Sequence, residues 1–370
     1  MEFTVLNTEL LDGLRVVTRA LNARPAKQIL EGVLVEAMDD AVTLVCSDGL
    51  LTIETTMSAS VAENGRVVLP GRLFTELCGK LPNGQVSIKV NDNHTAVVQC
   101  NRTRSSLAGM DAMEFPELPE VGRGYTIELP QNRLRDMVSR VAFSVATDES
   151  RQILTGCLLE VSADEVRVLA LDGFRLALQI QKQPYEMPQG KELLRSVIPG
   201  RVMNELSKVL REEDSPCELT ITKTHMQAVF GSHRMSAVLL AGDYIDYRRI
   251  LPPSFKTKAI IDRSAVAEAI DRAGLMAREG KSNLIRMSFR DNALAITSNG
   301  ETGDIHDELE CELEGDPIEI AFNVKYITDI MRNSPDDKLL MSFNTSVSPC
   351  VITPVDADTY LYLILPIRVF

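Results

Sequence analysis

The chain has 370 residues, of which 45% are hydrophobic and 25% charged, and its net charge is −13. This length allows two or three domains of ~100–200 residues, and the composition excludes a disordered or fibrous chain. An acidic balance argues against a simple nucleic-acid binder, although net charge does not report a basic lining on one surface.

We expect neither export nor membrane insertion. No apolar run reaches the ~18 residues of a membrane span, and residues 3–5 read directly as a strand, so we expect no signal peptide. The seven cysteines include no CxxC pair and lie in apolar contexts. We therefore expect buried, reduced thiols in a cytoplasmic protein.

The first predicted element, a strand followed by an amphipathic helix, occurs three times. Strands at residues 3–5, 125–127 and 259–261 precede helices at 7–21, 131–143 and 263–276. Apolar side chains at i, i+4 and i+7 give each helix one face to bury. They are Leu10, Leu14 and Val17, then Leu134, Val138 and Val141, then Val266, Ile270 and Ala273.

The second element is a hairpin around an Asp-Gly or Asn-Gly turn, because glycine adopts positive φ at little cost. It is predicted over residues 32–54, 156–178 and 285–305, with turns at Asp48-Gly49, Asp172-Gly173 and Asn299-Gly300. Arg175 stands in the apolar second half of the central hairpin. A charged residue in an apolar strand segment is unusual, and it is the first indication of a functional site.

The third element is a strand, a break and a second helix. Residues 67–77 and 196–206 share the pattern Pro-Gly-Arg-x-x-x-Glu-Leu, and residues 323–330 keep its basic, acidic and apolar positions. Arg72, Arg201 and Lys325 therefore occupy the same position in the three repeats, at the start of the second helix, which we call the basic slot. Basic side chains arranged in this way about an axis could contact phosphates without reading bases.

The fourth element is a closing pair of strands, over residues 86–107, 217–240 and 338–369, and Pro-rich joints follow at 115–122 and 251–254. The sequence thus predicts an α+β fold of three tandem modules, each with about eight strands and two helices packed on sheets. We place the modules at residues 1–122, 123–252 and 253–370.

Motifs for catalysis are not found in the sequence. Residues 274–282 end in Gly-Lys-Ser, but five residues separate the glycines where a P-loop has four, and the stretch follows a helix. The four histidines lack metal-ligand spacing, and GxSxG, HExxH and GxGxxG do not occur. We predict no catalytic residue, no metal, no cofactor and no enzymatic activity.

The C-terminal stretch, residues 361–370, is apolar to its end, whereas chain ends are usually polar. Pro366 should end the last strand, because proline cannot donate within a sheet. Leu365, Pro366, Ile367 and Val369 would then be free to line a groove.

Five short motifs in this order, on a triplicated chain, resemble the bacterial DNA polymerase III beta subunits, the sliding clamps. They are Arg24-Pro25, Asp172-Gly173-x-Arg175-Leu176-Ala177, residues 246–252 (DYRRILP), Phe322-Asn323-Val324-x-Tyr326 and Leu365-Pro366-Ile367-Arg368. The resemblance covers the whole chain.

The resemblance implies a non-catalytic processivity factor of the replicative DNA polymerase. Two chains would join head to tail into a six-module ring around duplex DNA and slide without base readout. The clamp loader, DNA polymerases and repair proteins would insert short linear peptides into a pocket between modules 2 and 3. No membrane partner is implied.

The resemblance also carries over residue by residue. The implied peptide pocket comprises Leu154, Gly173, Phe174, Arg175, Leu176, Ile245, Arg249, Ile250, Asn323, Tyr326, Leu363, Leu365, Pro366, Ile367 and Arg368. The implied DNA-facing residues are Arg24, Arg72, Arg201 and Lys325, and the implied dimer interface includes Leu107, Leu275 and Met276.

Several positions depart from the family pattern. Leu171 and Phe174 replace polar residues, Ile245 replaces a frequent proline, and Phe370 extends the tail, so we expect a more apolar pocket. Ser105 stands where relatives often carry an aromatic residue. It keeps open a monomeric peptide-binding scaffold, and an enzyme that uses a cleft between modules is the other alternative.

Overall fold

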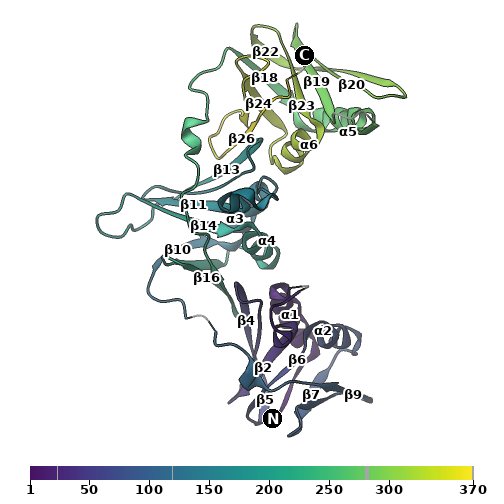
Figure 1. Cartoon of the computed structure of the whole chain (residues 1–370), viewed down its shortest axis with the longest axis vertical. Coiled ribbons are helices and arrows are strands. Elements are labelled where there is room, and N and C mark those ends of the chain that lie inside the picture. Colours follow the sequence, from purple (N-terminus) through teal and green to yellow (C-terminus); the bar gives the residue numbers. More distant parts are fainter. Residues whose placement is uncertain (23, 119, 280–282, 369–370) are drawn as a thin grey trace. The chain divides into compact units, whose positions relative to one another are not determined.

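The computed structural model of the chain describes residues 1–22, 24–118, 120–279 and 283–368 (Figure 1). Some expectations fall outside the described residues: Pro119 in the first joint, the Gly280-Lys281-Ser282 motif, and Val369 and Phe370 in the tail.

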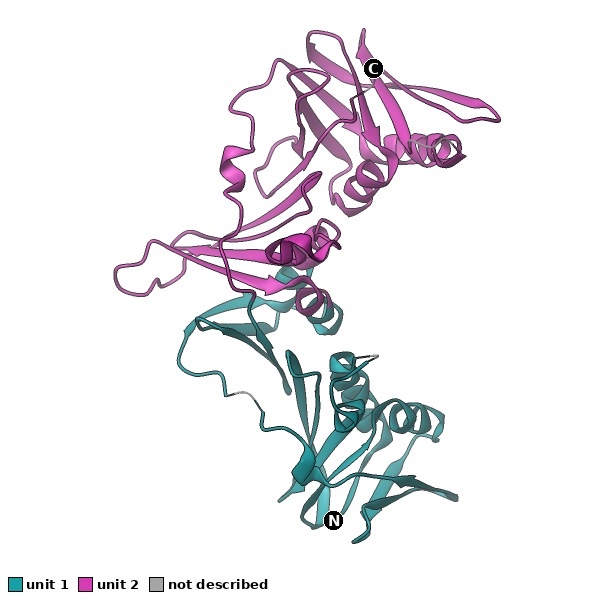
Figure 2. Cartoon of the chain, in the orientation of Figure 1, with its two compact units in different colours: residues 1–135, 205–239 teal, residues 136–204, 240–370 magenta. Residues whose placement is uncertain are grey.

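The chain divides into two compact units, coloured separately in Figure 2. Unit 1 comprises residues 1–135 and 205–239, and unit 2 comprises residues 136–204 and 240–370. Two of the three divisions fall inside α3 (Gln131–Ala142) and α4 (Gly200–Val209), and the third lies between Leu239 and Leu240. The units do not follow the three predicted modules, because each unit holds a sheet that joins strands from two of them. The module boundaries stay a prediction.

Unit 1 contains two antiparallel sheets, ordered β5-β1-β7-β8-β9 and β10-β15-β16-β17-β4-β3-β2-β6. The strands of the first are β1 (Glu2–Leu6), β5 (Ser60–Glu63), β7 (Gln85–Val90), β8 (Thr95–Cys100) and β9 (Thr103–Ala108). Those of the second are β2 (Gly32–Met38), β3 (Ala41–Ser47), β4 (Leu51–Ser58), β6 (Gly65–Pro70), β10 (Tyr125–Pro130), β15 (Pro216–Ile221), β16 (His225–Phe230) and β17 (His233–Val238).

Unit 2 also contains two antiparallel sheets, ordered β14-β11-β12-β13-β26-β25-β24-β18-β22 and β21-β20-β19-β23. The strands of the larger are β11 (Gly156–Ser162), β12 (Glu165–Leu171), β13 (Arg175–Lys182), β14 (Leu193–Pro199), β18 (Thr257–Asp262), β22 (Glu312–Gly315), β24 (Lys338–Phe343), β25 (Cys350–Pro354) and β26 (Tyr360–Ile364). Those of the smaller are β19 (Leu284–Arg290), β20 (Ala293–Asn299), β21 (Asp304–Glu310) and β23 (Ile318–Asn323).

The helices cover these sheets with the faces that the sequence predicts. In unit 1, α1 (Asn7–Val17) packs on β3 and β4 and beside α2 (Gly71–Lys80). In unit 2, α5 (Arg263–Glu279) packs on β19, β20 and β21 and beside α6 (Val324–Asn333). All three predicted apolar triplets are buried, which confirms the 3.6-residue period of these segments.

Two of the three predicted turns share one geometry, and the third is different. Gly49 and Gly173 have φ of 92° and 93°, in the left-handed region that favours glycine. Between β20 and β21 the loop is longer, and Gly300 does not adopt positive φ. The predicted hairpin is present, since β20 and β21 pair up to Asn299 and Asp304, but the positive φ expected of its glycine is wrong. A backbone bond from Gly300 to the carbonyl of Gly303 (2.8 Å) closes the loop instead.

Each predicted closing pair of strands is in fact a triplet within the described residues. The triplets are β7–β9, β15–β17 and β24–β26. The sequence reading merged two of the strands because the turns between them are short and polar, as at Asn101-Arg102 and Gly231-Ser232.

The first residue of each first helix makes the same long-range connection. The N–H groups of Asn7, Gln131 and Arg263 donate to carbonyls beyond the second helix, at Gly84, Ser215 and Asp337 (2.9, 2.9 and 2.8 Å). Their side chains add further bonds: Asn7 Nδ2 donates to Cys78 O in the last turn of α2, Gln131 Nε2 to Ser215 Oγ and Arg263 Nε to Asp336 O. Side chains of three different types thus donate hydrogen bonds to groups at or after the end of the second helix, where backbone carbonyls lack partners within the helix.

The seven thiols are free and buried, as the sequence predicts. Burial raises the pKa of Cys78, Cys157 and Cys217 to about 12. These sulfurs are therefore uncharged and unreactive in the folded chain. In the part of the chain that the structure describes, no helix is long and apolar enough to cross a membrane.

Candidate functional site

The tail after β26 is extended and fixed at two points in unit 2. The N–H of Leu365 donates to the carbonyl of Phe174, and that of Ile367 donates to the carbonyl of Ala321 on β23 (both 2.8 Å). Pro366 between them has no N–H to offer. The tail leaves β26 at Ile364, as predicted, and continues between the β12–β13 turn and β23.

The β12–β13 turn is rigid because Asp172 caps its backbone. Asp172 Oδ1 accepts from the N–H groups of Phe174 (2.9 Å) and Arg175 (3.0 Å), as in an Asx turn. The turn presents Phe174 to solvent, with 57% of the residue exposed. The Phe174 ring stacks on that of Tyr326, with centroids 5.8 Å apart and planes inclined by 22°.

Arg175 is almost wholly buried, and its guanidinium is fully engaged. Nε donates to Asp172 Oδ2 (3.0 Å), Nη1 to Asp329 Oδ2 on α6 (2.6 Å) and Nη2 to the carbonyl of Phe143 (2.5 Å). The guanidinium carbon lies 4.6 Å from the centroid of Tyr326 and 5.1 Å from that of Phe143. Arg175 therefore holds the aromatic rings and α6 in place, since little of its own surface remains for a ligand.

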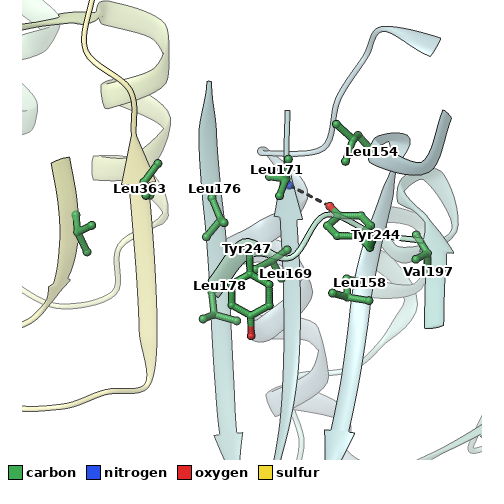
Figure 3. Packing of buried hydrophobic residues seen from close by; sticks show 11 residues of the cluster. Leu154, Leu158, Leu169, Leu171, Leu176, Leu178, Val197, Tyr244, Tyr247 and Leu363 are labelled. Carbon is green, nitrogen blue, oxygen red and sulfur yellow. Dashed lines mark hydrogen bonds between the residues drawn. The ribbon is translucent and has the colours of Figure 1, made fainter. Parts of the chain in front are cut away.

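A cluster of apolar side chains lies beneath the turn and the tail (Figure 3). Leu154, Leu171, Leu176 and Leu363 are buried in it, and Ile245 and Leu365 pack against it while partly exposed. Figure 3 shows Leu363 on the strand next to Leu176, and the hydroxyl of Tyr244 bonded to the backbone N–H of Leu171 (3.2 Å). Burial raises the pKa of Tyr244, so this hydroxyl stays protonated and also donates to the carbonyl of Gly156 (3.3 Å).

The structure brings most of the predicted pocket residues to this part of unit 2, with different degrees of exposure. The buried members are Leu154, Arg175, Leu176 and Leu363; the partly exposed ones are Ile245, Asn323, Tyr326, Leu365, Pro366 and Ile367; the exposed ones are Gly173, Phe174, Arg249, Ile250 and Arg368. Asn323 also has a local role, because its Oδ1 caps α6 by accepting from the N–H of Lys325 (2.9 Å).

Sequence reasoning missed three contributors to this site. They are Phe143, Tyr244 and Glu160, and no repeat, motif or resemblance in the sequence singles them out. A polar hollow of about 480 Å³, lined by Ala146, Thr147, Glu149, Gln152 and Thr155, lies beside Leu154. A larger hollow of about 700 Å³ lies elsewhere in unit 2, at the bend between β21 and β22. Its lining mixes four carboxylates with apolar side chains and includes none of the predicted pocket residues.

The predicted DNA-facing residues keep the common slot that the sequence assigns. Arg72, Arg201 and Lys325 are each the second residue of α2, α4 and α6, and all are exposed. Arg24 is exposed on the segment after α1. Within the described ranges, Arg24, Arg72 and Lys325 form no ion pair, whereas Arg15, Arg135, Arg140 and Arg272 on the first helices are paired with carboxylates.

The predicted interface residues lie on an edge strand of unit 1 and on a helix beside an edge strand of unit 2. Leu107 is on β9, at the edge of the smaller sheet of unit 1, and is only 6% exposed. Leu275, 54% exposed, and Met276 are on α5, which covers β20 and the edge strand β21. The exposed Arg102 and Arg104 lie at β9, and the exposed Asp304, Glu308 and Glu310 lie on β21.

A metal centre is not seen in the described part of the chain, where no three His, Cys, Asp or Glu side chains gather at ligand distance. The tail, the β12–β13 turn and β23 bring together buried leucines, the partly exposed Ile245 and Leu365 and the exposed Phe174 ring. Apolar side chains presented in this way can contact the apolar anchors of an extended peptide.

Comparison with known families accounts for nearly the whole chain. Three family models match: DNA polymerase III beta subunit, N-terminal domain (residues 1–119), central domain (residues 128–246) and C-terminal domain (residues 248–368).

Individual relatives agree with these matches over their full length. The beta sliding clamps of Bacillus subtilis and Staphylococcus aureus are each 30% identical to this chain, with 100% of both sequences covered. The crystal structure of the DNA polymerase sliding clamp from Bacillus subtilis superposes with a TM-score of 0.95 at 30% identity, covering 100% of both chains. A Pseudomonas aeruginosa sliding clamp bound to griselimycin superposes with a TM-score of 0.93 at 26% identity, again with 100% of both chains covered.

Proposed function

The chain belongs to the family of DNA polymerase III beta subunits, the beta sliding clamps, and on this premise we propose that it acts as a ring-shaped homodimer that encircles duplex DNA. Its function is that of a DNA polymerase sliding clamp, a non-catalytic processivity subunit in DNA replication. The proposal concerns how this chain's own residues close the ring, face the DNA and receive partners.

The observation that carries the ring is the pair of open, oppositely charged sheet edges. β9 ends one sheet of unit 1 and carries Arg104, while β21 ends one sheet of unit 2 and carries Glu308 and Glu310. Open edges present unpaired backbone groups that another strand can use. β9 of one protomer would pair with β21 of its partner, and the same contact repeated by rotation closes a dimer head to tail.

Apolar contact would accompany this pairing. Leu275 and Met276 provide exposed apolar surface beside β21, whereas Leu107 is mostly buried already and would serve as the floor against which they pack. Ser105, on the same face of β9 as Leu107, adds little apolar area. We therefore propose that charge complementarity carries a large share of specificity at this interface.

The exposed basic slot suits sliding. Arg24, Arg72, Arg201 and Lys325 would face the DNA and attract phosphates without contacting base edges. Such contacts are alike at every position along the duplex, so they do not oppose movement. The ring would hold DNA by topology, and these side chains would only weakly bias its path.

The apolar site at the tail would receive partner proteins. We propose that the clamp loader, DNA polymerases and repair proteins insert short linear peptides between Phe174, Ile245 and Leu365, above the buried Leu154, Leu176 and Leu363. The rest of the pocket would be formed by Gly173, Arg175, Arg249, Ile250, Asn323, Tyr326, Pro366, Ile367 and Arg368. The similarity to a clamp solved with griselimycin bound supports a ligand-binding role for this family.

The module boundaries at residues 122 and 252 are part of this proposal, since the family-model matches end or begin close to them. We also propose a cytoplasmic location, where the chromosome of a bacterium is replicated and where seven unpaired thiols stay reduced.

The test is retention on nicked circular DNA after loading by the cognate ATP-driven loader, before and after the circle is cut. A topological ring should be lost when the DNA becomes linear. Equal retention on both forms would mean ordinary binding and would favour a monomeric scaffold, which a mass of one chain at micromolar concentration would support.

A further inference from the structure

Glu160 is a buried carboxylate beside the proposed pocket, and it belongs to none of the groups assigned so far. It lies on β11 and is 2% exposed. Its cross-strand neighbours are Arg195 on β14 and Arg167 on β12. A buried carboxylate of this kind is retained only where its charge is compensated by several donors.

Both oxygens of Glu160 are saturated. Oε1 accepts from Arg248 Nη1 (3.2 Å) and pairs with Arg195 Nε (3.1 Å), and Oε2 accepts from Arg248 Nη2 (2.8 Å) and from the hydroxyl of Tyr247 (3.0 Å). Arg167 Nη1 donates to the same tyrosine hydroxyl (3.0 Å). Hydrogen bonding to Glu160 raises the pKa of Arg248, whose guanidinium also lies 4.6 Å from the centroid of the Tyr247 ring.

Two of these donors are consecutive residues of one segment, residues 244–250, which we call the pocket strap. The strap carries three proposed pocket residues: Ile245, Arg249 and Ile250. It contains a single 3₁₀ turn, Tyr247–Arg249, closed by bonds from Arg249 N to Asp246 O (3.2 Å) and from Ile250 N to Tyr247 O (3.0 Å). One such turn has little stability of its own.

The position of the strap must therefore come from side-chain anchors. Tyr244 anchors its start through the backbone of β11 and β12. Glu160 anchors its middle through Tyr247 and Arg248, and the buried Tyr247 ring also packs in the apolar cluster. The next two residues, Arg249 and Ile250, are exposed, and among the described residues the Arg249 side chain is bonded within the strap alone, to Asp246 (3.1 Å).

We propose that Glu160 is a positioning residue for peptide binding: it fixes the pocket strap so that Ile245, Arg249 and Ile250 meet a partner peptide, without contacting the peptide itself. The link to peptide binding rests on the proposed function of the pocket. A neutral amide could not replace the carboxylate, because its NH2 group would face guanidinium donors and its one oxygen cannot accept four bonds.

The test compares Glu160→Gln with the matched control Glu165→Gln. Glu165 also loses one negative charge in this variant, and it bonds Arg167 (2.6 Å) on the same sheet. No hydrogen bond or ion pair among the described residues joins it directly to Tyr247 or Arg248. We would measure affinity for a polymerase tail peptide, amide hydrogen exchange across the full-length chain and the mass of the dimer.

The proposal expects Glu160→Gln to weaken the peptide at least tenfold and to accelerate exchange at Arg249 and Ile250 at least tenfold. Exchange in β12 and β13 and the dimer mass should stay as in the wild type, and Glu165→Gln should change none of these quantities. Unchanged strap exchange in Glu160→Gln overturns the proposal, as does an equal acceleration throughout unit 2.

If Glu160→Gln does not fold, Tyr247→Phe removes one bond to the carboxylate and should accelerate strap exchange alone; unchanged exchange in this variant would also overturn the proposal. The exchange measurement separates this inference from the proposed function. A wild-type chain that binds no peptide would refute the pocket, while strap exchange would still decide whether Glu160 fixes the strap.

Discussion

The most constrained side chain near the pocket is Arg175, whose three guanidinium nitrogens contact Asp172, Asp329 and the carbonyl of Phe143. Its charge is satisfied within unit 2. By contrast, Phe174 one position earlier is rigid in backbone and exposed in side chain. The two neighbours have different roles: Arg175 holds the turn and α6 in place, and Phe174 exposes an aromatic ring that a ligand can contact.

Phe174→Ala should weaken a polymerase tail peptide by about 1–2 kcal/mol, roughly 5- to 30-fold, because an exposed aromatic ring on a rigid turn is a typical anchoring contact. The unfolding midpoint should barely change, since the ring is 57% exposed. Titration with a labelled peptide measures the effect. Leu50→Ala is the control, because Leu50 holds the same position in the Asp48-Gly49 turn and is 66% exposed. Equal losses in both variants would show that Phe174 has no specific role.

His233 should make unit 1 sensitive to mild acid. It pairs with Thr55 across β17 and β4 through a side-chain hydrogen bond, and burial, reinforced by the Arg211 charge, lowers its pKa. The folded state therefore favours the neutral ring. Its contribution to stability is present above a pH of about 6.5 and is lost as the pH falls through the lowered pKa.

The measurement is the free energy of unfolding in urea between pH 7.5 and 5 at one protein concentration. His233→Gln should flatten the loss seen in the wild type across this range. The other three histidines remain in both proteins, so parallel curves for the two would refute the role of His233.

Among the secondary-structure elements, the start of each first helix is bonded to the region at the end of the second helix, and a different residue type makes this connection in each repeat. Asn7, Gln131 and Arg263 each begin a first helix, and the backbone N–H of each donates to a carbonyl after the second helix. Asn7 Nδ2 donates to the carbonyls of Cys78 (3.1 Å) and Leu81 (3.4 Å), which end α2. The side chain therefore joins α1 to α2 in addition to their apolar contact.

Asn7→Ala should lower the free energy of unfolding by about 1–2 kcal/mol, because two carbonyls at the end of α2 lose a donor. Urea denaturation would measure it. Thr8→Ala, at the exposed next position of the same helix, should cost a few tenths of that at most. A smaller loss in Asn7→Ala than in Thr8→Ala would contradict the capping role.

Periodic and repeated features of this chain were predictable from the sequence. The apolar triplets, the Asp-Gly turns and the Arg72, Arg201 and Lys325 slot all follow from local chemistry that recurs. The Gly300 turn was not predictable, because a longer loop and packing against α5 replace the local preference there. The anchors of the pocket strap were hidden as well, since Glu160 meets Arg248 only across 88 positions of sequence.

For the molecule as a whole, the distribution of charged residues is more informative than the net charge. A chain of net charge −13 pairs most basic residues of its first helices with carboxylates, yet leaves Arg72 and Lys325 without an ion pair among the described residues. Such a distribution lets an acidic protein attract phosphates at chosen positions only.

Replacing both Arg72 and Lys325 with alanine should reduce the salt dependence of duplex binding. If each side chain neutralises one phosphate, the slope of log K against log salt should fall by about 0.9 per site removed. Fluorescence anisotropy with a short duplex at several salt concentrations measures the slope. Arg332→Ala is the control, since Arg332 is on α6 but is paired with Asp271 (3.1 Å). A slope that changes only in the control would refute the assignment.

The seven buried thiols can report how often different segments of this molecule open. They are distributed through both units, at 46, 78, 100, 157, 217, 311 and 350, and each is shielded while its own segment is closed. A thiol-specific reagent added to the native protein can therefore modify a given cysteine only during a local opening. The order in which the seven are alkylated would rank the segments of the chain by how often they open, without any mutation.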